Sequence, residues 1–148
     1  MRKKAKQQVS AALEAQGRVH WIKHKGVKIL KLDFSGLSAE ASLQVMEQFT
    51  SIMRQEGKAS VRLLSDVTGT QYDTSVASQW RQVRFQYNDR ITYSAIYGAS
   101  GLVLTAVKTF YQMLKLMGLK SGSNFLLADS EAQAKDYLAN STKDEAAP

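Results

Sequence analysis

The sequence contains no cysteine, and it has no apolar run approaching the roughly 20 residues that a helix needs to span a bilayer. The lack of cysteine excludes disulfide bonds, thiolate metal ligands and cysteine nucleophiles, and it is compatible with a reducing cytoplasm. The first thirty residues also lack the apolar segment of a signal peptide. We therefore expect a soluble, cytoplasmic protein.

Motifs for catalysis, cofactors and metals are lacking as well. No G-x-S-x-G elbow surrounds a serine, and Gly98–Gly101 has the spacing of neither the dinucleotide fingerprint nor the lysine-bearing phosphate loop. His20 and His24 would lie about 13 Å apart on a strand, too far to share a metal ion. We expect no cofactor, no metal and no enzymatic activity. The remaining enzyme hypothesis uses Asp33 and Asp66, which end two predicted strands. If those strands are neighbours, the two acids could approach each other, which would raise the pKa of one of them or let them hold a cation.

The positive charge of the chain is concentrated at its N-terminal end. The net charge is +7, and residues 1–31 carry nine lysines and arginines but one acid, Glu14. A solvated basic arm or frayed helix over residues 1–17 is the favoured interpretation, and contact with nucleic acid or an anionic membrane is the less favoured one. The length of 148 residues predicts one domain, which we place at residues 18–140, followed by a disordered tail at 141–148.

Apolar periodicity predicts an α/β domain with a mixed five-stranded sheet and about four helices. The predicted strands are Arg18–Lys25, Val27–Phe34, Ser60–Asp66, Ile91–Gly98 and Asn124–Ala128. The first two strands form a hairpin through the turn signal Lys25-Gly26. The predicted helices begin at a Ser38 cap, at an Asp73 or Thr74 cap, at Leu102 and at an Asp129 cap.

The predicted helix Leu102–Met117 is unusually apolar because it carries two stripes. One stripe comprises Val103, Val107, Phe110, Leu114 and Met117, and the other comprises Leu102, Ala106, Met113 and Leu116. A helix that covers a sheet needs one stripe, so the second predicts deep burial, a homodimer interface or the wall of a lipophilic cavity. Burial in the core is the first interpretation and a homodimer the second. In the third, the helix lines a site for a ligand held between it and the sheet. The candidate residues for the dimer surface or the ligand site are Leu102, Met113, Leu116 and Met117.

The stretch Val61–Thr70, VRLLSDVTGT, organises the predicted sheet. Its apolar part reads as a buried central strand. The carboxyl end of that strand would place Asp66, Thr68 and Thr70 at the rim of the sheet, where α/β proteins usually carry their functional groups.

The sequence resembles the SpoIIAA-like members of the STAS superfamily. The resemblance rests on the element order, the segments KGVKILKLDFSG and IYGASGL, the acid-then-hydroxyl motif after Asp66 and the closing DSEAQAKDYLA. This is the fold of bacterial anti-sigma-factor antagonists, and the resemblance covers roughly residues 18–140. It implies a non-enzymatic signalling module that binds a protein partner, such as a kinase or a sigma-factor regulator. Sec14-type lipid-binding domains have a similar fold, which keeps the carrier of a small lipophilic ligand as the alternative.

The resemblance also implies a site. The antagonists carry a D-S-S-G pattern with a phosphorylated serine at the start of the next helix. The matching residues Asp66–Gly69 would place Thr68 at that serine, where a phosphate would meet the unpaired amides of the helix N-terminus. The first serine is replaced by Val67, and Thr70-Gln71-Tyr72 lengthens the loop. The partner-binding rim would comprise Asp66, Thr68, Gly69, Thr70, Tyr72, Arg81, Arg84 and Phe85. The alternative is purely structural: the two threonines satisfy turn amides and Asp66 braces the loop.

Overall fold

A computed structural model describes residues 2–145, with side chains described for residues 9–141. The elements in chain order are α1 (Arg2–Ala15), β1 (Val19–His24), β2 (Val27–Asp33), α2 (Ala39–Gln55), β3 (Val61–Asp66), α3 (Thr74–Gln86), β4 (Ile91–Tyr97), α4 (Gly101–Leu116), α5 (Lys120–Ser123), β5 (Phe125–Ala128) and α6 (Glu131–Glu145). The strands form one five-stranded sheet in the order β1-β2-β3-β4-β5. The β1–β2 pair is antiparallel and the other pairs are parallel, which confirms the predicted mixed sheet.

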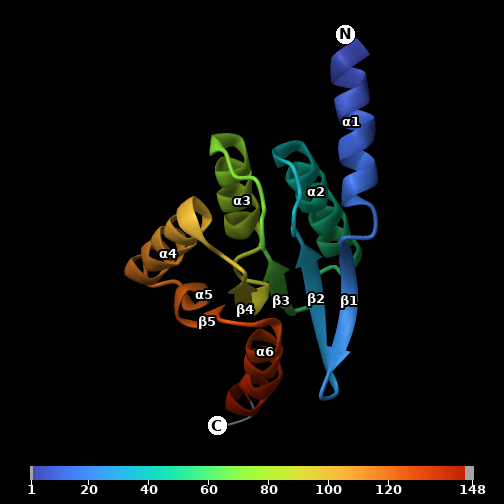
Figure 1. The fold of residues 1–148 in the computed structure, drawn as a ribbon. Helices are drawn as coiled ribbons and strands as arrows, with labels where there is room; N and C mark the ends of the chain where they lie inside the picture. Colours follow the sequence, from blue (N-terminus) through green and yellow to red (C-terminus); the bar gives the residue numbers. More distant parts are fainter. Residues whose placement is uncertain (1, 146–148) are drawn as a thin grey trace.

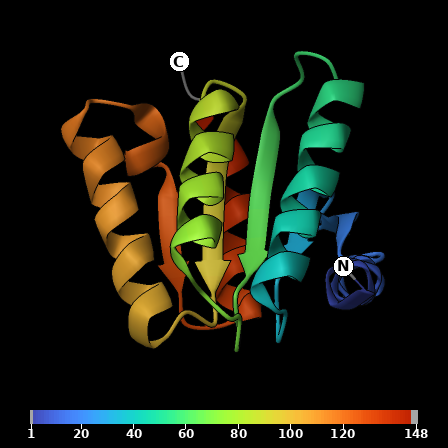
Figure 2. The ribbon, with the colours of Figure 1, turned by 90° about the horizontal axis from the view of Figure 1, so that it is seen from above.

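Helices cover both faces of the sheet. Helices α2, α3 and α4 lie over one face, α6 lies over the other, and α1 stands beside α2 at the β1 edge (Figures 1 and 2). The central strand β3 is nearly inaccessible: Val61, Leu63 and Leu64 are all buried. Leu63 belongs to the core cluster under α2, whereas Leu64 belongs to the cluster under α6. Successive side chains of a strand point to opposite faces, so β3 joins the two halves of the core.

The predicted local signals correspond to observed turns and caps, with one exception. Lys25 and Gly26 both adopt positive φ, 52° and 80°, in the β1–β2 hairpin turn. Ser38 accepts a hydrogen bond from the amide of Ala41 and caps α2, and Asp73 caps α3 in the same way. The prediction that Asp129 caps the last helix is wrong. Ser130 Oγ accepts the hydrogen bond from the Gln133 amide, at 3.1 Å.

Both ends of the chain are more helical than predicted. The basic segment forms α1, whose Ala11 and Ala15 are buried in the core cluster that α2 also contributes to. Gln48 Nε2 on α2 donates to the carbonyl oxygen of Ala15 at 2.8 Å, so this end of α1 is attached to the domain. At the other end, α6 continues to Glu145, and only residues 146–148 of the predicted disordered tail lie outside the described residues.

Only one stripe of α4 enters the core. Val107, Phe110, Tyr111 and Leu114 are buried. Leu102, Leu116 and Met117 are 76%, 83% and 58% exposed, so the prediction that they belong to the core is wrong, and Met113 is only partly buried against the cluster. The reason lies in the topology: α4 is the outermost of the three long helices on its face of the sheet, so its outer side faces solvent (Figure 2). The short helix α5, which was not predicted, follows it.

Candidate functional site

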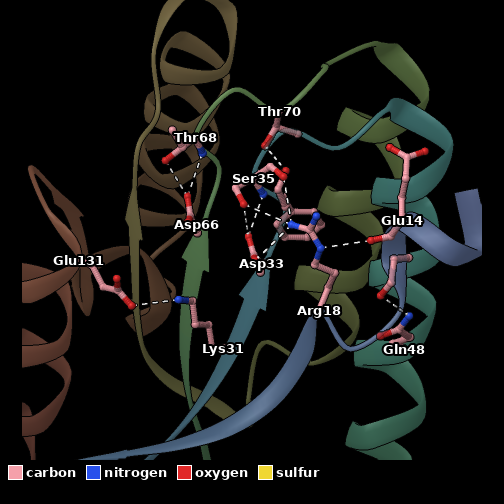
Figure 3. A network of polar contacts seen from close by, with 12 residues as sticks. Glu14, Arg18, Lys31, Asp33, Ser35, Gln48, Asp66, Thr68, Thr70 and Glu131 are labelled. Carbon is pink, nitrogen blue, oxygen red and sulfur yellow. Dashed lines mark hydrogen bonds and ion pairs between the residues drawn. The ribbon is translucent and has the colours of Figure 1, made fainter.

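The adjacent strands β2 and β3 are each followed by a turn, and the two turns are of the same type and lie at the carboxyl edge of the sheet. Asp33 Oδ1 accepts hydrogen bonds from the Ser35 amide at 2.9 Å and from Ser35 Oγ at 2.6 Å. Asp66 Oδ1 accepts from the Thr68 amide at 3.0 Å and from Thr68 Oγ1 at 2.7 Å (Figure 3). The local sequences are DFSG and DVTG. In each, the aspartate satisfies the amide and the hydroxyl two residues later, which is the hydrogen bonding of an Asx turn.

The two turns are joined to each other by hydrogen bonds beyond the ends of the strands. The Phe34 amide donates to the carbonyl of Asp66 and the Gly36 amide to the carbonyl of Thr68, both at 2.8 Å. Thr70 Oγ1 donates to the carbonyl of Phe34 at 2.7 Å. The hydroxyl of Thr70 therefore has a structural role, but it bonds a carbonyl of the neighbouring turn, whereas the structural interpretation predicts a bond to a turn amide.

The third loop of the rim closes over Thr68. A Cβ atom at Gly98 would lie 2.0 Å from Thr68 Oγ1 and 2.9 Å from the Thr68 amide nitrogen, and Gly98 has a φ of +82°. Both the space and the backbone conformation therefore require glycine here. Thr68 itself stays exposed, between this glycine and solvent.

Arg18 holds the turn at Asp33 and was not identified from the sequence. Its Nη1 lies 3.2 Å from Asp33 Oδ2 and donates to the Ser35 carbonyl at 3.0 Å. Partial burial works to raise the pKa of Asp33, but the Ser35 hydrogen bonds and the charges of Arg18 and Lys31 outweigh it, so the pKa lies below its ordinary value. The only sequence signal was a basic residue at the start of the first strand. The pairing of Arg18 with Asp33 depends on the position of the loop between α1 and β1, and only the tertiary structure determines that position.

A second polar chain approaches Asp66 from the α6 side. Tyr97 OH donates to Asp66 Oδ2 at 3.1 Å. Burial and the negative charge of Asp66 raise the pKa of Tyr97 to about 12, although Lys31 opposes this. Lys31 Nζ lies 2.9 Å from Glu131 Oε1, so the Glu131 carboxylate is matched by a cation (Figure 3). The hydrogen bond from Lys31, followed by that from Lys135, lowers the pKa of Glu131.

The predicted rim residues do not all come together. Asp66, Thr68, Gly69 and Thr70 lie at the rim, and Tyr72 lies in the loop that follows. Arg84 is wrongly predicted as a partner contact: it is 1% exposed, and its Nε donates to Tyr111 OH at 3.2 Å. Phe85 is 39% exposed, but its ring packs edge-on against Phe110. Both residues lie about 15 Å along α3 from its N-terminus, because a helix rises about 1.5 Å per residue. Arg81 is exposed on the same helix.

The expected position of Thr68 at a helix N-terminus is also wrong. Helix α3 begins at Thr74 with Asp73 as its cap, and the side chain of Asp73 already accepts from the Val76 amide. The lengthened loop places Thr68 ahead of this cap, beside Asp66 instead. A phosphate on Thr68 would therefore meet a carboxylate and not the free amides of α3.

Two apolar cavities lie near α3 and α4. The inner one has a volume of about 50 Å³ and is lined by apolar side chains that include Phe34, Trp80 and Val107. The outer one has a volume of about 200 Å³ and is lined in part by Arg81, Phe110 and Met113. Tyr72 and Trp80 line both. Ligand pockets typically measure about 300–1,000 Å³, so neither cavity reaches that size.

Within the described residues, no cluster of histidine and acidic side chains could hold a metal ion. In the same part of the chain, none of the helices combines the length and the apolarity needed to cross a membrane. Asp33 and Asp66 do lie on neighbouring strands in direct register. Each carboxylate, however, is hydrogen-bonded within its own turn.

Comparisons with known proteins agree with the architecture. No family model matches the sequence, and no curated protein matches it. Among solved structures, the chain is similar to an uncharacterized protein of the DUF3478 family from Shewanella loihica PV-4, described as having a SpoIIAA-like fold. The two share 14% sequence identity with a TM-score of 0.60, over 81% of this chain and 91% of the other. At this identity the likeness establishes the fold, and it confirms the resemblance inferred from the sequence: the chain has a SpoIIAA-like fold.

Proposed function

We propose that this protein is a non-enzymatic signalling module that binds a protein partner through the rim at the carboxyl edge of the sheet. The observation that carries the proposal is the environment of Thr68. Thr68 is exposed, and its hydroxyl is hydrogen-bonded to Asp66 at 2.7 Å. It lies against Gly98, where any Cβ atom would clash with it. An exposed hydroxyl in a fixed position after the central strand suits recognition by another protein.

A phosphate on Thr68 would change this rim strongly. It would replace a hydrogen-bond donor with a charge of about −1.5 to −2 next to the Asp66 carboxylate. Repulsion would then oppose the Asx turn and disturb the bond from Tyr97 to the same carboxylate. The switch we propose therefore acts by like-charge repulsion at the rim.

The non-enzymatic part of the proposal is supported by the two aspartates of the rim. Catalytic acids usually show a raised pKa, because the acid must keep its proton near neutral pH. The pKa of Asp33 is lowered instead, and its carboxylate is occupied by Ser35 and Arg18. Asp66 is occupied by Thr68 and Tyr97 in the same manner.

The test compares partner capture by three variants under native conditions. Tagged wild-type protein, Thr68→Ala and Thr68→Glu are exposed to a lysate of the host, with Ser51→Glu on the exposed side of α2 as the matched control. We expect the same partner on the wild type, on Thr68→Ala and on Ser51→Glu, and none on Thr68→Glu. Equal capture by Thr68→Glu and Ser51→Glu, with both variants folded, would contradict the switch. Intact-mass analysis of the protein from its host, with mapping of any phosphate to a peptide, then shows whether Thr68 is phosphorylated.

A second candidate function is the binding of a small lipophilic ligand beside α4. The observations in its favour are the apolar outer cavity and the exposed Leu102, Leu116 and Met117. Native mass spectrometry of the purified protein tests it. A carrier would lose a defined mass on denaturation and would be indifferent to Thr68→Glu, whereas a homodimer would show twice the chain mass.

A further inference from the structure

Strand β1 leaves one edge of the sheet unpaired. The strand order places it at the end of the sheet, and its six residues pair with β2 in one continuous register, without a bulge. Helix α1 lies beyond the start of β1 and not alongside it, and Figure 1 shows no described element on the outer side of the strand. The opposite edge strand, β5, has only four residues. Because short length, bulges and prolines usually protect an edge, β1 is the edge that can still accept a strand.

The hairpin fixes which backbone groups of β1 point outward. The Asp33 amide donates to the carbonyl of Arg18 at 2.9 Å, and the same register continues to the hairpin turn. Hydrogen-bonded and non-hydrogen-bonded pairs alternate along an antiparallel ladder. The amides and carbonyls of Val19, Trp21 and Lys23 therefore face away from β2, and no described residue outside the sheet hydrogen-bonds them. An added strand would pair with these alternating donors and acceptors.

Two cations without a counter-charge lie side by side at the hairpin end of this edge. Lys23 is directly opposite Lys28 in register, both are exposed, and among the described residues neither forms an ion pair. Lys28 Nζ lies 3.9 Å from the centre of the Trp21 ring. Like charges directly opposite each other on neighbouring strands are destabilising. An acidic side chain next to Lys23 would offset this repulsion.

We propose that the β1 edge binds an acidic, extended peptide segment of a partner protein, which adds to the sheet as a sixth strand. Its main chain pairs with the outward groups of Trp21 and Lys23, and one of its acidic side chains pairs with the Lys23 ammonium. Charge complementarity selects this partner, because residues 1–31 carry nine lysines and arginines against one acid. The site is separate from the rim: Lys23 lies at the hairpin end of β1, whereas Arg18, which contacts the rim, precedes the first residue of the strand.

Two other occupants fit this edge less well. A second copy of the chain would pair β1 with β1, and neither strand contains an acid to offer to Lys23. A nucleic acid would match the charge, but it has no main chain of alternating amides and carbonyls, and β1 offers a single tryptophan on which bases could stack. An acidic peptide satisfies both the charge and the backbone groups.

The test measures binding of a fluorescently labelled peptide, acetyl-EVEVEVE-amide, to the full chain by fluorescence anisotropy at pH 7. We expect saturable binding to wild type, and binding at least about tenfold weaker to Lys23→Glu. This variant should fold, because a glutamate opposite Lys28 replaces a like-charge pair with an opposite-charge pair. The matched control is Lys108→Glu on the exposed side of α4, at the other end of the sheet (Figure 2). It makes the same charge change and should bind within about twofold of wild type, since distant surface charges are screened.

Amide hydrogen exchange shows whether the peptide adds as a strand. We expect the Trp21 and Lys23 amides to exchange rapidly in the free protein and to be protected by the peptide. The same peptide N-methylated at every residue keeps its charges but has no main-chain donor, so it should bind at least about tenfold more weakly.

Four results would each overturn the proposal. The first three are no saturable binding, equal losses in Lys23→Glu and Lys108→Glu, and equal binding of the methylated and unmethylated peptides. The fourth is protection of the same amides by another occupant. Protection that rises with protein concentration alone would identify a second copy of the chain, and protection by an oligothymidylate but not by the peptide would identify a nucleic acid.

Discussion

Asp33 and Asp66 lie opposite each other in register on the parallel strands β2 and β3, and each closes an Asx turn of the same design. The two turns then diverge in their surroundings. Asp33 is paired with Arg18, so its side of the rim is neutralised. Asp66 receives hydrogen bonds from Thr68 and Tyr97, and among the described residues no cation forms an ion pair with it. An added charge would therefore perturb the Thr68 turn more than its twin at Ser35.

Gly98 should tolerate no side chain. Gly98→Ala would place a Cβ against Thr68 in addition to adopting a positive φ. We expect this variant to lose about 2–4 kcal/mol of unfolding free energy, of which about 1–2 kcal/mol is the conformational cost and the rest is the steric clash. Urea denaturation measures it.

Gly118→Ala is the matched control for that variant. Gly118 also has a positive φ, of +76°, but a Cβ there would meet nothing within 4 Å. Gly118→Ala should therefore lose only the conformational cost, about 1–2 kcal/mol of unfolding free energy. Equal losses in the two variants would show that Thr68 and Gly98 are not in close contact.

The Asp33 turn should make stability depend on acid pH. Because the folded pKa of Asp33 is lowered, its carboxylate stabilises the fold above the ordinary aspartate pKa of about 4, and this contribution is lost as the pH falls through the lowered value. We expect wild type to exceed Asp33→Asn in unfolding free energy by a constant amount between about pH 5 and 7, and by progressively less below about pH 4. Urea denaturation across this range tests it. A difference that is unchanged at acid pH would contradict the pairing of Asp33 with Arg18.

Tyr97 should titrate late in alkali. Its pKa is raised to about 12, so the folded protein retains this proton after the unfolded chain has lost it at about pH 10. Between the unfolded and the folded pKa of Tyr97, only the folded state keeps this proton, so the free energy of unfolding decreases as the pH rises. Phenolate absorbance of the native protein should show a late-titrating tyrosine that Tyr97→Phe removes. An unchanged absorbance titration in that variant would mean that another tyrosine is responsible.

Two leucines of α4 should respond in opposite ways. Leu114 is 1% exposed and Leu116 is 83% exposed. Leu114→Ala should cost about 2–5 kcal/mol of unfolding free energy by leaving a cavity. Leu116→Lys should change it by less than about 0.5 kcal/mol in the monomer. A large loss for Leu116→Lys that depends on protein concentration would instead place this residue in a homodimer interface.

The sequence determined the fold class because its signals are local. Alternation with period two, helical stripes and the capping residues Ser38 and Asp73 depend on neighbours along the chain, and the observed elements follow them closely. The same holds for the acid-then-hydroxyl motif at Asp66 and Thr68, since an Asx turn forms within three residues. These parts of the rim were therefore predictable.

The tertiary structure decided which partners distant residues meet. Arg18 reaches Asp33 and Tyr97 reaches Asp66 because strands from separate parts of the chain end side by side, which no local pattern encodes. The same applies to exposure: a stripe on α3 or α4 shows that residues share a side, but the neighbouring element decides whether that side is covered. Arg84 would be expected at the surface because it is charged, yet it is buried against Tyr111. Leu116 is apolar, yet it is exposed to solvent.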